Sequence, residues 1–155
     1  MHPKYQGMTV KEKVEKLFGE IKKGHYEFRD EFFETIWVNV TSLAHGDGGT
    51  EWLREWLDWA SAHSAEHPDF LELTLLSIGA IEFLADDFDL ALHHLERAHD
   101  LFSARKDEDG VAACYIYRSG RGRYWYRMNP QTIEIEWLPL LIYHHSRKPQ
   151  TYKIR

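Results

Sequence analysis

The sequence predicts an all-α fold, an antiparallel helix-hairpin array of about seven helices. Apolar residues recur with helical period along most of the chain, and breaks rich in Gly, Pro and Asp separate the periodic segments. One spacing also recurs, in which a small residue is followed twelve positions later by an apolar triplet at i, i+4 and i+7. The clearest copy is Gly79 followed by Ala91, Leu95 and Ala98. Such a spacing describes two closely packed antiparallel helices that are then used again.

The first two helices follow from a cap and an apolar stripe. Thr9 and Glu12 have the spacing of a capping box, and the apolar residues after them predict a helix over 9–23. A second stripe predicts a helix over 26–44, which ends before the glycine-rich run 45–49.

The next two helices have recognisable starts. Thr50 suits an N-cap for a third helix that ends near His67. Pro68, whose fixed φ suits a first helical turn, opens a fourth helix that continues to Leu84. The fourth helix is apolar almost all round, so we expect it to lie between neighbouring helices.

The last part of the chain predicts three further helices and a tail. A fifth helix covers about 88–104 and a sixth covers about 111–128. The segment 132–143 alternates like a strand at its start but also repeats the apolar triplet. We interpret it as a helix kinked at Pro139, because a lone strand would have no pairing partner in an otherwise helical chain. Residues 144–155 form a basic tail.

Residues 75–102 resemble a tetratricopeptide repeat (TPR). The family pattern of large and small positions falls on Leu75, Ile78 and Gly79 in the first helix, and the Ala91, Leu95, Ala98 triplet follows in the second. Weaker copies surround Thr41 and Gly120, and the copies are separated by 38 and 41 residues. The resemblance implies one TPR-like α-solenoid domain over 1–155, in which the helix 9–23 precedes three helix pairs at about 26–66, 68–104 and 111–143. An irregular helical bundle with one fortuitous match is the alternative.

The resemblance also implies a function and a binding groove. In this family the first helix of each pair lines a concave groove, so the chain is expected to be a noncatalytic protein–protein interaction module, an adaptor or sensor domain such as those of signalling proteins. The expected partner is an apolar peptide or helix with acidic residues. The alternative is a self-associating structural domain whose groove is filled by a second subunit. The partner-binding candidates are Leu73, Leu76, Phe83, Tyr117, Arg118, Arg121, Tyr124 and Trp125.

Charge is distributed unevenly along the chain. Residues 115–155 hold eight Lys or Arg against two acidic residues, a balance of +6. Because the net charge of the whole chain is −6, residues 1–114 carry −12. A molecule with one acidic and one basic end can steer an acidic partner toward the basic end or favour head-to-tail self-association. The simpler interpretation is two differently solvated faces.

Compartment and alternative partners follow from composition. No apolar run approaches the roughly 20 residues needed to span a bilayer, and the first residues lack the apolar core of a secretory signal. We therefore expect a cytoplasmic protein without membrane contact, in which the one cysteine, Cys114, is a small buried side chain. Residues 115–127 interleave four Arg with aromatic rings, as single-stranded nucleic acid binders do, but the acidic remainder of the chain disfavours that partner.

Catalytic and metal-binding patterns are weak. His63 and His67 stand at i, i+4, yet the sequence supplies no third ligand beside them, and the histidines are most simply interpreted as solvated. No phosphate-binding glycine loop, nucleophile elbow or CxxC pair occurs. We therefore expect no enzyme activity, no metal and no cofactor.

Overall fold

A computed structural model of the chain describes residues 7–46, 51–111 and 114. Within these ranges every regular element is a helix and no strand occurs, which confirms the predicted all-α class. The elements are α1 (Val10–Lys22), η2 (Tyr26–Phe28), α2 (Arg29–Val38), α3 (Val40–His45), α4 (Glu51–Ala62), α5 (Pro68–Leu84) and α6 (Phe88–Ala104).

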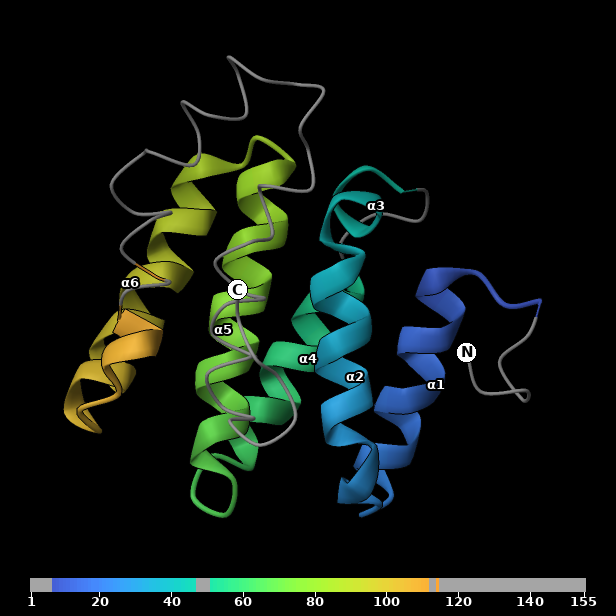
Figure 1. Ribbon diagram of the computed structural model, residues 1–155, viewed down its shortest axis with the longest axis horizontal. Coiled ribbons are helices and arrows are strands. Elements are labelled where there is room, and N and C mark those ends of the chain that lie inside the picture. Colours follow the sequence, from blue (N-terminus) through green and yellow to red (C-terminus); the bar gives the residue numbers. More distant parts are fainter. Residues whose placement is uncertain (1–6, 47–50, 112–113, 115–155) are drawn as a thin grey trace, which may run out of the picture.

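Helix α5 is the centre of the described structure. It packs against α6 on one side and against α2, α3 and α4 on the other, as Figure 1 shows. Every residue from Phe70 to Leu84 is buried, so α5 has no solvent-facing stripe along that length. This confirms the expectation that a helix apolar all round lies between neighbours.

Helices α5 and α6 form the hairpin that the Gly79 spacing predicts. Ala91, Leu95 and Ala98 are all buried along α6. A Cβ placed on Gly79 would lie 2.6 Å from Leu95 Cγ and 3.4 Å from the Ala91 carbonyl oxygen. The second distance is an ordinary van der Waals contact, but the first is much shorter, so the Leu95 side chain leaves room only for a residue without a side chain at this crossing.

Aromatic rings fill the space between α1, α2, α4 and the first turns of α5. Phe32 is fully buried, and its ring centroid lies 5.2 Å from that of Trp56 and 6.0 Å from that of Phe70. Phe33 contributes a further edge-on contact to Phe70 at 5.0 Å. These rings join α2 and α4 to the first turns of α5.

The helix predicted over 26–44 is wrong as one continuous element, because it is divided into η2, α2 and α3. The break between α2 and α3 lies at Asn39, whose φ of −125° and ψ of 21° are not helical. Its side-chain amide donates to the Thr35 carbonyl at 2.8 Å, and its backbone N–H donates instead to the Ile36 carbonyl at 3.1 Å. The asparagine side chain thus takes the carbonyl that would accept the next helical hydrogen bond, and the helix stops.

Other predicted boundaries differ by less. The Thr9–Glu12 capping box is present, with both of its hydrogen bonds at 3.1 Å. Helix α4 ends earlier than predicted, and turns occupy residues 63–66. The helix after α6 begins at residue 108 rather than 111, where Asp107 Oδ1 accepts a hydrogen bond from the Gly110 N–H at 3.2 Å. This N-terminal cap was not recognised in the sequence because it lies within a polar run.

The three predicted helix pairs are described to different extents. Within the first, 26–66, both α3 and α4 pack on α5. The second, 68–104, is the α5–α6 hairpin. Of the third pair the structure describes Val111 and Cys114, and Cys114 is buried, as expected. The other residues of that pair, with Gly120, and the tail 144–155 lie outside the described residues.

Candidate functional site

The partner-binding residues predicted on α5 are part of the core. Leu73, Leu76 and Phe83 are 4%, 0% and 5% exposed. Phe83 also packs edge-on against Phe88 at the start of α6, with ring centroids 5.5 Å apart. Helix α5 therefore offers no open groove at these three positions, because neighbouring chain covers them. The other five candidates, Tyr117, Arg118, Arg121, Tyr124 and Trp125, lie outside the described residues.

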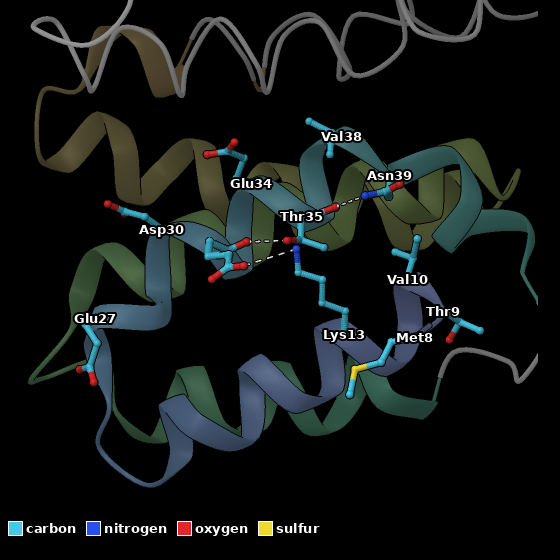
Figure 2. Close-up of a pocket in the computed structure, with 11 residues that line it drawn as sticks. Met8, Thr9, Val10, Lys13, Glu27, Asp30, Glu34, Thr35, Val38 and Asn39 are labelled. Atoms are coloured by element: carbon cyan, nitrogen blue, oxygen red, sulfur yellow. Dashed lines mark hydrogen bonds and ion pairs between the residues drawn. The ribbon is translucent and has the colours of Figure 1, made fainter. Parts of the chain in front are cut away.

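An open cleft of about 550 Å³ lies instead between the start of α1 and the length of α2 (Figure 2). Helical period explains its wall on α2, because acidic and apolar residues three or four positions apart share one face. The facing wall comes from the capped first turn of α1 and the residue before it. The cleft is lined by Met8, Thr9, Val10, Lys13, Glu27, Asp30, Glu31, Glu34, Thr35, Val38 and Asn39.

The charge of the cleft is predominantly negative. Four carboxylates line it, against the single amine of Lys13. The Lys13 ammonium reaches across from α1 to Glu31 at 3.4 Å, and Asp30 is paired with Arg29 at 3.2 Å. Figure 2 shows Glu27 and Glu34 near opposite ends of the acidic wall. Because one amine faces four carboxylates, the cleft keeps a net negative charge.

Apolar side chains lie beside these carboxylates. Val38 is 48% exposed, one of three large apolar side chains in the described residues with that degree of exposure. Met8 and Val10 are half-buried on the facing wall. A surface that combines carboxylates with exposed apolar groups suits a chain segment that carries Lys or Arg together with an apolar side chain.

The sequence contains a signal for one wall of this cleft, and it lies outside the repeat pattern. Glu27, Glu31 and Glu34, with Val38, follow each other at helical spacing and therefore share one face. An acidic face is usually only solvated, so the pattern alone does not show that a second helix stands opposite it. That information comes from the packing of α1 against α2.

A smaller pocket of about 180 Å³ lies between α1 and α4, walled by aromatic rings. Trp52 and Trp56 stack with ring centroids 5.7 Å apart, and Phe18 and Phe32 also line the pocket. The ammonium of Lys22 lies 4.6 Å from the Phe18 ring centroid and 2.7 Å from a Glu55 carboxylate oxygen. The chain's own cation therefore already makes the cation–π and ionic contacts that this pocket offers.

Not every histidine is the solvated surface residue that the sequence predicts. His63 and His67 are half-buried and stack on the rings of Trp59 and Tyr26, with ring centroids 4.0 and 3.7 Å apart. The His94 side chain is 12% exposed, and its Nδ1 lies 2.6 Å from the carboxylate of Glu82, which is also buried. This contact joins α6 to α5, so its role is in the hairpin. In the part of the chain that the structure describes, no group of three His, Cys, Asp or Glu residues is placed to hold a metal ion.

Comparisons with known proteins add no assignment. No protein-family model matches the chain, and neither a curated protein nor a solved structure matches it significantly. Among the described residues, no helix is both long enough and apolar enough to cross a membrane. The TPR resemblance therefore depends on the sequence pattern and on the α5–α6 hairpin that accompanies it.

Proposed function

We propose that the chain is a noncatalytic protein–protein interaction module with a TPR-like arrangement of helix hairpins. The observation that carries the proposal is the cleft between α1 and α2, which combines four carboxylates with the exposed side chain of Val38. Such a surface recognises a chain segment by charge and by one apolar anchor. The helix array serves as the rigid frame that holds the two walls apart.

The cleft favours a basic segment as the bound partner. The sequence-based expectation was an acidic apolar partner, bound by Arg118, Arg121 and the neighbouring aromatic residues. That surface stays part of the proposal as a second contact. The cleft is acidic and the sequence 115–127 is basic, so probes of opposite charge separate the two proposed contacts.

The test uses two labelled synthetic peptides, one alternating lysine with leucine and one alternating glutamate with leucine, titrated with the full chain while fluorescence anisotropy is measured. We expect the lysine peptide to bind and the double variant Glu27→Lys/Glu34→Lys to weaken that binding about tenfold, because two attractive contacts become repulsive. The glutamate peptide should bind as well and lose affinity in Arg121→Glu.

A matched control separates the cleft from the net charge of the protein. The double variant Asp58→Lys/Glu66→Lys changes the charge by the same amount at two exposed positions that do not line the cleft. We expect it to bind the lysine peptide almost as the unmodified chain does. Equal loss in both double variants, or no binding of either peptide, would contradict the proposed function.

A further inference from the structure

The chain contains a segment whose chemistry complements the α1–α2 cleft. Residues 144–155 hold Arg147, Lys148, Lys153 and Arg155 and no acidic residue. Tyr152 and Ile154 add apolar side chains between the last basic residues. The cleft offers the matching set, with four carboxylates beside Val38, Met8 and Val10.

The complementarity extends beyond the cleft itself. Residues 1–114 carry a charge of −12 and residues 115–155 carry +6, so two copies attract when the acidic part of one meets the basic part of the other. Such a contact either is exchanged reciprocally between two copies or continues from copy to copy as a ring or a chain. The alternative occupant is a basic segment from a different protein. That occupant would not explain why the acidic and basic parts of this chain have complementary charge.

We propose that the α1–α2 cleft binds the basic C-terminal segment, residues 144–155, of a second copy of this chain. The inference rests on the proposed function, because it names the partner of the same cleft. Basic side chains of the segment face the carboxylates of the cleft, from Glu27 in η2 to Glu34 in α2, and its apolar side chains contact Val38. The product is a head-to-tail self-association whose strength falls as salt rises, because exposed ion pairs are screened over about 8–10 Å at moderate ionic strength.

The test is sedimentation velocity of the full chain over a range of concentrations and salt. We expect the mass to increase with concentration at low salt and to fall toward that of one chain at high salt. The cleft variant Glu27→Lys/Glu34→Lys and the tail variant Arg147→Glu/Lys148→Glu should each weaken self-association about tenfold. A chain that combines all four changes restores opposite charges across the interface, and it should associate again.

Controls distinguish this contact from general attraction between charged proteins. Circular dichroism shows whether each variant is folded, and Asp58→Lys/Glu66→Lys should associate nearly as the unmodified chain does. A chain that stays monomeric at every concentration overturns the inference, as does equal weakening by the cleft and control variants or failure of the combined variant to recover. Binding of the lysine–leucine peptide to a monomeric chain would keep the proposed function and reject only the second copy as partner.

Discussion

The two sides of α5 are held by different kinds of contact. On the side of α1, α2 and α4, large rings fill the space, and Phe32 alone stacks with or meets edge-on the rings of Phe18, Phe33, Trp56 and Phe70. On the side of α6, small residues let two backbones approach, with Gly79 against Leu95. Packing on the first side depends on large side chains that fill the space between helices. Packing on the α6 side depends on the absence of a side chain where the two helices cross.

The α6 side also contains two polar contacts to buried carboxylates. Glu82 contacts His94 at 2.6 Å, and Glu72 accepts a hydrogen bond from Arg105 at 2.7 Å. Both carboxylates lie on α5, which is otherwise almost entirely apolar. Polar contacts thus fix the register of the closely packed helices α5 and α6. On the aromatic side, the fit between ring shapes holds the helices together. Variants on each side should therefore fail in different ways.

The largest expected effect is loss of a ring on the aromatic side. Phe32→Ala should lower the free energy of unfolding by about 4 kcal/mol, because it removes a fully buried ring and leaves a cavity among four others. That is a large part of the 5–15 kcal/mol typical of a domain. Urea unfolding followed by circular dichroism measures it. Phe32→Leu should lose much less, and an equal loss in both would argue against a volume-dependent core.

The second effect comes from filling the empty crossing between α5 and α6. Gly79→Leu should destabilise the chain by about 3 kcal/mol, because the added side chain would overlap that of Leu95. Thermal unfolding measures the loss.

Gly19 in α1 is the matched control, since a Cβ placed there meets nothing within 4 Å. Gly19→Ala should raise stability by about 0.5–1 kcal/mol through helix propensity alone. A gain in stability at both glycines would show that the crossing does not require a missing side chain.

The same difference explains how much of the fold could be predicted from the sequence. A glycine within an apolar helix, followed by small residues twelve and nineteen positions later, is a rare pattern with one simple explanation, and the hairpin it predicts is present. Ring-to-ring packing leaves no such spacing, because many arrangements satisfy the same apolar stripe. The break at Asn39 was missed for a related reason: its side-chain hydrogen bond to Thr35 competes with a helix that the apolar stripe alone supports.

The candidate site was harder to predict than the fold. The TPR resemblance predicts Leu73, Leu76 and Phe83 as ligand contacts because they are non-packing positions of a groove-lining helix, but neighbours on both sides of α5 bury them. The cleft is formed by two separate helices, through the acidic face of α2 and the capped start of α1. Periodicity identifies each face, whereas only the packing of α1 on α2 shows that they stand opposite each other.

The smallest expected effect concerns pH and again separates the two sides of α5. Burial raises the pKa of Glu72 above its usual value of 4.5, although the Arg105 guanidinium partly opposes the shift. A carboxyl with a raised pKa stabilises the fold fully below pH 4.5, and this contribution is lost as the pH rises through the folded-state pKa. Glu72→Gln keeps an oxygen for Arg105 without the charge, so it should match the unmodified chain in acid and exceed its stability at neutral pH.

Glu12 in α1 supplies the control of opposite sign for that measurement. Its hydrogen bonds with Thr9 lower the pKa of its carboxyl, so its contribution is present above the usual value of 4.5 and is lost as the pH falls through the folded-state pKa. Glu12→Gln should therefore be less stable than the unmodified chain at neutral pH and approach it in acid. Thermal unfolding at a series of pH values gives both curves. Parallel curves for the two variants would mean that burial in the α5–α6 hairpin does not set the titration of Glu72.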